Sequence, residues 1–372
     1  MASGFSLKDQ LFNAEKVRYL AGLFHGADAG FDALGFEARV MARLPELELK
    51  QRITWIAEVL GEMLPGDLPE VAPVLSAALP APLDPTKSDD DFGDFIFAPL
   101  GEWVAELGAE QHPDLGLDLL EEITQRFSME WAIRPFLNAH PNLVLTRMQG
   151  WAGHDSYHVR RLVSEGTRPR LPWGQAVGLG LQDPLPLLDQ LHGDPTRYVT
   201  RSVANHLNDI TKKEPDLVFD RLEQWHTRAE QQPEELDWMT RHALRGVVKA
   251  GHPRALKMLG YDPEAEVRAV LELDAAEVKI GETLGLSCSL SGSKGQPVLV
   301  DYRIHFPRPG GKISAKVFKW KQGRLGQDGL QLAKAHKLKG DATTFTLVPG
   351  AHVVELMVNG RVAANASFEL VR

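Results

Sequence analysis

The sequence is almost without cysteine, since Cys288 is alone among 372 residues. A single cysteine excludes an internal disulfide and a cysteine-rich zinc site, which fits a reducing compartment. We expect Cys288 to serve in packing.

Long apolar runs are missing as well. No stretch approaches the roughly 18 apolar residues of a membrane helix, and the start, MASGFSLKDQLFN, lacks the basic and then apolar order of a secretory signal. With 43% hydrophobic residues, the chain still has enough apolar material for packed cores. We therefore expect a cytoplasmic protein without a membrane partner.

The common enzyme motifs are also absent. The sequence contains no Walker glycine loop, no dinucleotide-binding glycine pattern and no GxSxG nucleophile elbow. His154 and His158 stand four apart on an expected helix, but no third ligand and no HExxH context accompany them. We predict no metal site and no cofactor, which leaves a helical binder or an unusual enzyme.

Charge is distributed unevenly along the chain. The net charge is −9, and a uniformly acidic surface would argue against nucleic acid. Residues 1–127 hold 9 basic and 23 acidic residues, residues 128–256 hold 16 and 15, and residues 279–339 hold 12 and 3. The last segment, with a net charge of +9, predicts an electrostatic footprint for a polyanion.

The pattern of residues 1–265 predicts helix after helix. Apolar residues recur at three and four spacing in segments such as LKQRITWIAEVLGEML and DLGLDLLEEITQRF, with short loops of Pro, Gly and Asp between them. Residues 78–95, rich in proline and acids, interrupt this rhythm, and we expect a long surface loop there. Residues 1–265 thus form the first expected domain.

Within residues 150–250 the sequence repeats with a period of 40. The repeat is an apolar residue followed two positions later by an arginine, at Val159 and Arg161, Val199 and Arg201, and Met239 and Arg241. Forty residues fall within the HEAT period, in which helix pairs stack into a curved solenoid with a concave binding face. The arginines would line one side of it, either as a row of DNA contacts or as salt bridges within the repeats.

Near residue 266 the pattern changes to alternating runs rich in β-branched and aromatic residues. The expected strands are VRAVLEL, TLGLSCSL, VLVDYRIHF, KVFKW, TTFTLV, HVVELMV and ASFELV. Asn359 and Gly360, between the last two, predict a type I′ hairpin. Residues 266–372 therefore form a second expected domain, and the predicted fold class is an all-α HEAT-like-repeat solenoid followed by a small all-β immunoglobulin-like sandwich.

The helical region contains the segments SLKDQLFNAEKVRYLA, FSMEWAIRPFL, SYHVRRLVSEGTRPRLPW and SVANHLNDITKKEP. These segments resemble the opening and central motifs of the AlkC family, DNA-alkylation repair glycosylases with HEAT-like repeats. The basic sandwich resembles the immunoglobulin-like appendix that some of these proteins carry. The resemblance therefore covers nearly the whole chain.

The resemblance implies a glycosylase that excises 3-methyladenine and 3-methylcytosine from duplex DNA without base flipping, unlike most base-modifying enzymes. An N3-alkylated base carries positive charge, so its glycosidic bond is already weakened and its departure needs no general acid. Carboxylates aimed at the deoxyribose would stabilise the charge that develops there, and one would position the attacking water.

Three acids are the candidates for this role: Glu130 and Glu165 foremost, and Asp209 third. The alternative for each is a helix-end carboxylate in a salt bridge, and Glu130 also suits the first turn of a helix, where the helix dipole favours an acid.

The other candidate residues would hold the DNA. Basic and polar side chains would contact phosphates, and two tryptophans would press against the sugar or the lesion. In the helical region these residues are Trp131, Arg161, Arg168, Arg170, Trp173, Arg201, Asn205, His206, Asn208, Lys212 and Lys213. In the sandwich, the second half of a clamp, they are Lys312, Lys316, Lys319 and Lys321. The alternatives are core packing for the tryptophans and a solvated face for the sandwich lysines.

We therefore expect a monomeric enzyme whose partner is double-stranded DNA with alkylated bases, and which is nucleoid-associated when it is on DNA. A second hypothesis is a non-catalytic HEAT-repeat module that binds DNA or a protein. A third is a scaffold that binds a basic partner through its acidic N-terminal half. The central acids distinguish the first hypothesis from the other two, because only an enzyme needs them for base release.

Overall fold

The computed structural model describes residues 6–87, 91–308, 310–340 and 345–372. The chain divides into two compact units, one ending at Ala243 and the other beginning at Leu244. The division falls within one helix, α14 (Pro233–Lys249), and a short helix, α15 (Pro253–Met258), follows it in the second unit.

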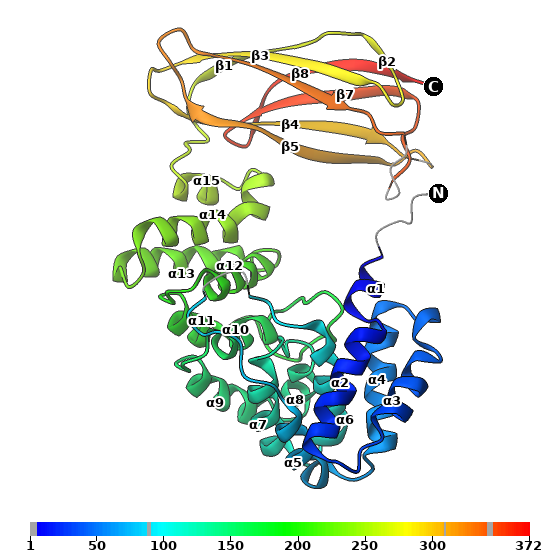
Figure 1. Ribbon diagram of the computed structural model, residues 1–372. Coiled ribbons are helices and arrows are strands. Elements are labelled where there is room, and N and C mark those ends of the chain that lie inside the picture. Colours follow the sequence, from blue (N-terminus) through cyan, green and yellow to red (C-terminus); the bar gives the residue numbers. More distant parts are fainter. Residues whose placement is uncertain (1–5, 88–90, 309, 341–344) are drawn as a thin grey trace. The chain divides into compact units, whose positions relative to one another are not determined.

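The first unit consists of helices joined by loops (Figure 1). Its α-helices before α14 are α1 (Leu7–Leu11), α2 (Ala14–Ala27), α3 (Ala33–Met41), α4 (Leu49–Met63), α5 (Leu68–Ala78), α6 (Ala98–Gly108), α7 (Pro113–Thr124), α8 (Ile133–Ala139), α9 (Pro141–Trp151), α10 (Tyr157–Gly166), α11 (Leu185–Leu191), α12 (Arg197–Ile210) and α13 (Pro215–Arg228). Two 3-10 turns are η1 (Leu44–Glu46) and η2 (Phe95–Phe97). No helix in the described part of the chain has the length and apolar character needed to cross a membrane.

Helix starts carry the residues that favour them. Proline occupies the first position of α7, α9 and α13, where its missing N–H breaks no helical hydrogen bond. Asn13 caps α2 by accepting a hydrogen bond from the Lys16 amide at 3.1 Å, and Asp67 and Glu70 form a capping box on α5. These residues mark where one helix begins after another, so the helical region consists of many short helices.

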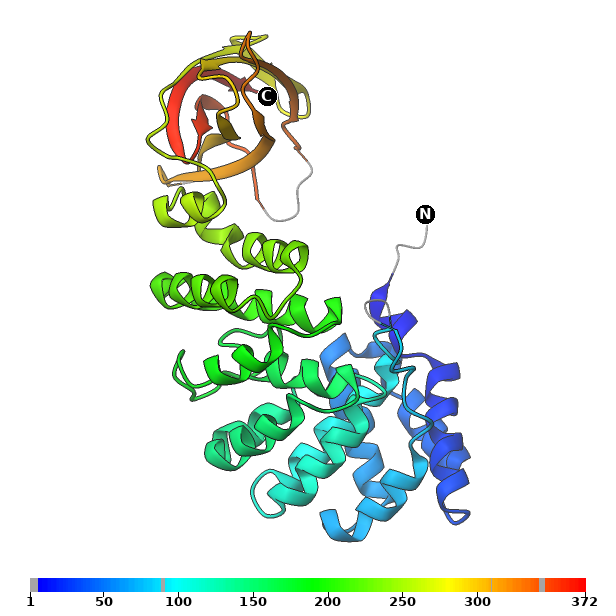
Figure 2. The same cartoon turned by 90° about the vertical axis from the view of Figure 1, so that its left-hand side faces the viewer.

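The apolar residues of the 40-residue repeat are fully buried. Val159 of α10, Val199 of α12 and Met239 of α14 each have 0% of their surface exposed. Helix α10 packs against α12, and α11 and α13 also pack against α12. The helices therefore follow one another in chain order (Figure 2), and each buries its apolar stripe against its neighbours. The predicted helical solenoid is confirmed.

A long loop joins α5 to η2, as predicted for residues 78–95, although residues 88–90 lie outside the described part of the chain. The Arg126 side chain anchors the loop by donating from Nε to the Pro80 carbonyl at 2.8 Å. Gly93 has a φ of 77°, and a Cβ at that position would lie 1.9 Å from the Arg126 carbonyl oxygen. Only glycine lets the loop pass this close to the end of α7.

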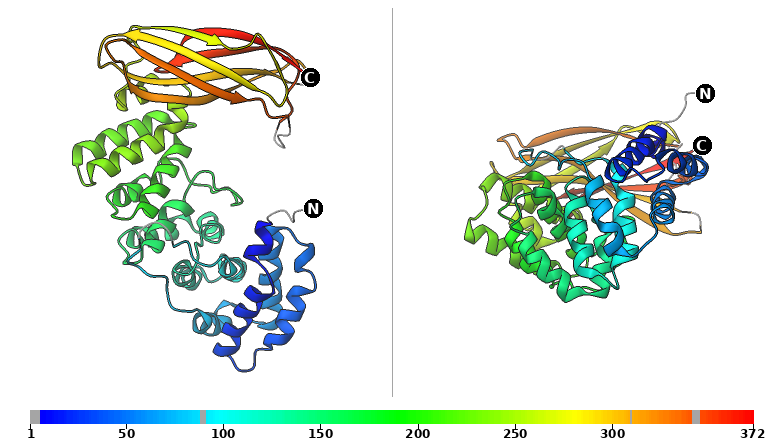
Figure 3. Two further views of the ribbon diagram at one scale, coloured as in Figure 1. Left: turned by 45° about the horizontal axis from the view of Figure 1, so that its top comes forward. Right: turned by 60° about the horizontal axis from the view of Figure 1, so that its bottom comes forward.

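The second unit continues as a two-layered β-sandwich (Figure 3). Its strands are β1 (Val267–Leu273), β2 (Glu277–Lys279), β3 (Thr283–Gly292), β4 (Pro297–Pro307), β5 (Ile313–Arg324), β6 (Leu330–Lys337), β7 (Gly350–Val358) and β8 (Arg361–Val371). One sheet has the order β1-β3-β6 and the other β2-β8-β7-β4-β5. Neighbouring strands are antiparallel except for β2, which runs parallel to β8.

The two sheets enclose one apolar core. Cys288 of β3 lies in it together with Ile304 of β4 and Leu356 of β7, so the expected packing role of this cysteine is confirmed. Asn359 and Gly360 join β7 to β8 with φ values of 47° and 81°, the two positive values that a type I′ turn requires. The predicted order of solenoid and sandwich is confirmed.

The strand prediction was incomplete in two places. Strands β2 and β6 were not expected, because β2 is only three residues long and β6 is a lysine-containing edge strand with little apolar alternation. Of the strand expected at residues 343–348, positions 343 and 344 lie outside the described part, and 345–348 form no strand. Phe345 and Leu347 nevertheless pack against the sandwich core from this loop.

Candidate active site

The three candidate acids lie in one ion-pair network. Glu130 lies in the turn before α8, Glu165 in the last turn of α10 and Asp209 in the last turn of α12. Arg161 joins the first two, with Nη1 2.8 Å from Glu130 Oε2 and Nη2 3.6 Å from Glu165 Oε2. Arg168 pairs through Nη1 with Glu165 and places Nη2 2.7 Å from Asp209 Oδ2. Carboxylates and guanidiniums therefore alternate along the network.

Two serines complete the hydrogen bonding of these acids. Ser128 donates from Oγ to Glu130 Oε2 at 2.9 Å, and Ser202 donates to Glu165 Oε2 at 2.6 Å. Among the residues that the structure describes, Glu130 Oε1 is the one oxygen of the three carboxylates that accepts no hydrogen bond. It is the carboxylate oxygen of the network that remains available to a substrate or a water.

Two of the three acids are buried, and the arginines keep Glu165 charged. Glu165 is 4% exposed and Asp209 is 7% exposed. Burial works to raise the pKa of Glu165, but Arg161 and Arg168 outweigh it and hold the pKa below its usual range. Burial likewise opposes the charge on Arg161, whose pKa is nevertheless raised by Glu130 and Glu165. Fixed carboxylates in such surroundings can stabilise a positive charge that develops beside them.

A buried arginine positions the loop that follows α10. Arg134 of α8 is 0% exposed, and its Nη1 donates to the carbonyls of Gly166 at 2.9 Å and Arg168 at 3.1 Å. Its Nε donates to the Gln175 carbonyl at the other end of the loop. Arg134 thus fixes both ends of the segment that contains Trp173.

The two candidate tryptophans lie against each other at the edge of this loop. Their ring centroids are 5.9 Å apart, and Trp131 Nε1 donates to the Pro172 carbonyl at 3.1 Å. Trp173 is 55% exposed and has a φ of 66°, which is unfavourable for a bulky residue. Core packing is therefore excluded for Trp173, and its indole is presented to solvent.

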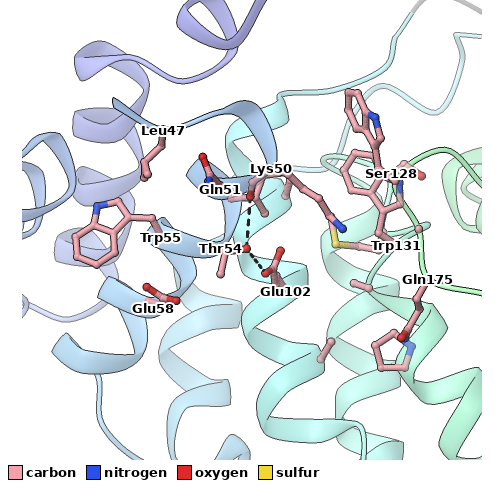
Figure 4. Close-up of a pocket in the computed structure, with 18 of the residues that line it drawn as sticks. Leu47, Lys50, Gln51, Thr54, Trp55, Glu58, Glu102, Ser128, Trp131 and Gln175 are labelled. Atoms are coloured by element: carbon pink, nitrogen blue, oxygen red, sulfur yellow. Dashed lines mark hydrogen bonds between the residues drawn. The ribbon is translucent and has the colours of Figure 1, made fainter. Parts of the chain in front are cut away.

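A cleft of about 580 Å³ opens beside the tryptophans. One side is formed by α4, including Lys50, Thr54 and Trp55, and the other by Ser128, Trp131 and neighbouring residues (Figure 4). Glu102 of α6 lies between these sides and accepts a hydrogen bond from Thr54 Oγ1 at 2.5 Å. Trp173 also lines the cleft.

The predicted DNA contacts of the helical region have different surroundings. Arg170, Lys212 and Lys213 are exposed, although Lys212 Nζ lies 2.7 Å from Asp209 Oδ1. The other charged or polar candidates are half-buried or buried within the helix packing: Arg161, Arg168, Arg201, Asn205, His206 and Asn208. In this structure Arg161 and Arg168 form ion pairs with the candidate acids, which was the alternative to DNA contact. Contact with DNA remains a prediction for every residue of this set.

Two of the buried candidates connect helices. His206 Nδ1 lies 3.0 Å from the Ser164 carbonyl oxygen, which makes this nitrogen the protonated one. Asn208 Nδ2 donates to the Ala243 carbonyl at 2.8 Å. Burial lowers the pKa of His206 to about 4, so this histidine is neutral in the folded protein at neutral pH.

The four candidate lysines of the sandwich, called the lysine row of β5 below, lie along one strand but on both of its faces. Lys316, Lys319 and Lys321 are exposed on β5, the edge strand of the larger sheet, and Lys312 immediately precedes that strand. Lysine on an edge strand also prevents pairing with other chains. The row is suited to a polyanion, and its contact with DNA remains a prediction.

The described residues contain no group of three or more His, Cys, Asp or Glu side chains arranged to hold a metal ion. His158 is 3% exposed, and burial lowers its pKa to about 4. Its ring packs against Tyr157 and Tyr198, with the ring centroids 4.2 and 5.5 Å away.

Sequence reasoning missed several residues that organise the site. Ser128 and Arg134 occur within FSMEWAIRPFL, and Ser202 begins SVANHLNDITKKEP. Their place in these segments was the available signal. Nothing in the local pattern indicates that a serine or an arginine will meet a carboxylate or a carbonyl from another helix.

Known proteins resemble this chain over both units. A family model described as "Uncharacterised protein YhaZ, C-terminal Ig-like domain" matches residues 268–372. The Bacillus subtilis (strain 168) protein described as "Uncharacterized protein YhaZ" is 31% identical over 330 residues, which cover 88% of each chain. The structure of the Pseudomonas fluorescens alkylpurine DNA glycosylase AlkC, bound to DNA containing an abasic site analog, is 34% identical with a TM-score of 0.86 and covers 99% of this chain and 100% of that one. The chain therefore belongs to the AlkC/YhaZ family.

Proposed function

We propose that this chain is a DNA glycosylase that excises cationic N3-alkylated bases, 3-methyladenine and 3-methylcytosine, from duplex DNA without base flipping. The observation that carries the proposal is the ion-pair network in which Arg161 and Arg168 hold Glu130, Glu165 and Asp209 together. The AlkC relative supports it, because that structure contains an abasic site analog, and an abasic site is what base excision leaves behind.

The reaction fits a site with carboxylates and no general acid. The bond between C1′ and the base nitrogen breaks, and its electron pair stays with the base, whose positive charge is thereby cancelled. The deoxyribose takes up the positive charge. Water adds to C1′ and loses a proton, which leaves a hydroxyl on the sugar and a free neutral base.

The three acids would divide this work. Glu130 has the one carboxylate oxygen without a donor among the described residues, so it would face C1′ or orient the attacking water. Glu165 and Asp209, each held by Arg168, would supply fixed negative charge near the sugar. The main role of Arg161 and Arg168 would be to hold the carboxylates in position. Contact with phosphate would be secondary for both arginines.

DNA would be held by the exposed groups around the network. The Trp173 indole would press against the sugar or the lesion, and Arg170, Lys212 and Lys213 would contact phosphates. The lysine row of β5 would grip the duplex as the second half of a clamp. These contacts give register and affinity without reading sequence.

The test is base release from methylated duplex DNA by the purified chain, with the free bases identified by chromatography. Release of 3-methyladenine and 3-methylcytosine above the spontaneous rate supports the proposal. Tight DNA binding without release would instead identify a non-catalytic binding module, and absence of both would indicate a protein scaffold.

A further inference from the structure

We infer that the cleft beside Trp131 and Trp173 holds the excised base after its glycosidic bond has broken. This inference rests on the proposed function, and it assigns to the cleft a ligand of one chemical class, a free alkylated nucleobase. The base would enter it as a separate molecule, so that no nucleotide has to be flipped out of the duplex first.

The cleft is continuous with the carboxylate network. Ser128 lines the cleft, and the same hydroxyl oxygen donates to Glu130 Oε2 at 2.9 Å and accepts from Arg161 Nη1 at 2.8 Å. Trp131, the next lining residue in the chain after Met129, follows Glu130 directly. A base released beside Glu130 therefore lies next to two residues that line the cleft, Ser128 and Trp131.

The walls suit a flat aromatic ligand. Trp55, Trp131 and Trp173 all line the cleft, and its surface as a whole is predominantly apolar. Stacking on aromatic side chains is tolerant of base identity, because every base has a π-face. A volume of about 580 Å³ lies in the usual range for small-molecule sites and leaves room for a methylated purine with water.

The polar groups of the cleft favour a neutral base over a nucleotide. Its charged lining residues are Arg43, Lys50, Glu58 and Glu102, whose formal charges cancel. Arg43 stacks over the Trp55 ring at 4.4 Å, and Lys50 extends into the cleft toward Trp131 (Figure 4). A phosphate group would meet Glu58 and Glu102 as well as the cations, whereas ring nitrogens and an exocyclic amine can use both kinds of group.

Equilibrium dialysis of the full chain against free 3-methyladenine tests the inference. We expect saturable binding of one base per chain, and weaker binding of 2′-deoxyadenosine 5′-monophosphate. Gln175 is exposed and lines the cleft, so Gln175→Trp places an indole in it and should weaken base binding at least about tenfold. Gln111→Trp adds the same side chain at an exposed turn outside the cleft and should leave base binding unchanged.

Three results would overturn the inference: no saturable binding of 3-methyladenine, equal binding by the wild type and Gln175→Trp, or tighter binding of the nucleotide than of the base. If the wild type binds no free base while Gln175→Trp loses affinity for abasic duplex DNA, the cleft is part of the DNA path instead. Base release is measured on the same preparation. Release without base binding refutes this inference alone, whereas absence of release refutes the proposed glycosylase.

Discussion

Ser202 of α12 donates a hydrogen bond of 2.6 Å to Glu165 of α10, 37 residues away in the sequence. Together with Arg161 and Arg168, this hydroxyl favours the charged form of Glu165 against the effect of burial, and the pKa of the acid is lowered. The carboxylate is therefore ionised and fixed in place before any substrate binds.

Replacing Ser202 by alanine tests this arrangement. Loss of the donor should raise the pKa of Glu165, so the acid limb of the pH profile of base release should move to higher pH. Single-turnover release measured from pH 3 to pH 7 reports the change. Ser164→Ala is the control, because the Ser164 hydroxyl lies 3.0 Å from the Ser202 hydroxyl, whereas the described hydrogen bonds to the Glu165 carboxylate come from Arg168 and Ser202. Coincident profiles for wild type and Ser202→Ala would contradict the role given to this bond.

Arg168→Met should destabilise the fold strongly. Two buried acids, Glu165 and Asp209, would each lose a partner, and breaking a buried pair in this way costs roughly 3–5 kcal/mol. Arg170→Met is the matched control, because Arg170 is exposed only two residues along the chain, and it should change the free energy of unfolding by less than about 0.5 kcal/mol. Urea unfolding of both variants provides the measurement, and equal midpoints would argue against a compensating role for Arg168.

Two buried histidines make the fold sensitive to mild acid. Burial lowers the pKa of both His158 and His206 from 6.5 to about 4. Below pH 6.5 each of these histidines binds a proton in the unfolded chain but stays neutral in the folded chain. The free energy of unfolding therefore decreases progressively as the pH falls from 6.5 to about 4. The loss is up to roughly 3 kcal/mol for each histidine.

Urea unfolding at successive pH values from 7 to 4 tests this expectation. His206→Gln should show a shallower dependence in that window, because one of the two titrating groups is gone. His226→Gln is the control, because His226 is exposed on α13, whereas His206 is buried. A wild-type unfolding free energy that stays constant from pH 6.5 to pH 4 would contradict the account.

The lysine row of β5 predicts a change in the salt dependence of DNA binding. Each phosphate contact contributes about −0.9 to the slope of log affinity against log salt. Replacing Lys312, Lys316, Lys319 and Lys321 with glutamine should therefore flatten that slope by up to about 4 units. The measurement is the affinity for abasic duplex DNA at several salt concentrations.

A matched variant separates local contact from net charge. Four other exposed lysines of the same unit are suitable for replacement with glutamine: Lys279, Lys294, Lys337 and Lys339. This variant has the same net charge as the first. Equal slopes for the two variants would show that the β5 row makes no specific phosphate contacts.

The architecture was predictable because it rests on periodic patterns. Val159, Val199 and Met239 recur every 40 residues, and all three are buried in the helix stack. Asn359 and Gly360 are local turn formers, and the structure has positive φ at both. Strand β6 escaped prediction because an edge strand needs fewer apolar residues, and Phe345 suggested a strand although its ring reaches the core from a loop.

The connections within the site were less predictable. The acids Glu130 and Glu165 were chosen from their segments, but the sequence did not reveal that Arg161 joins them. That contact depends on how the turn before α8 packs against α10. The buried role of Arg134 was invisible for the same reason, since its three carbonyl partners lie at least 32 residues away in the sequence.

The most direct test of the central claim is single-turnover release of 3-methyladenine from methylated duplex DNA by the wild type and by Glu130→Gln. Glu130 Oε1 has no donor among the described residues, so the amide should preserve the fold while removing the charge next to the sugar. We expect release to fall by about 10²–10³-fold, with affinity for abasic DNA nearly unchanged. Equal release by both proteins, or no release by the wild type above the spontaneous rate, would contradict the account.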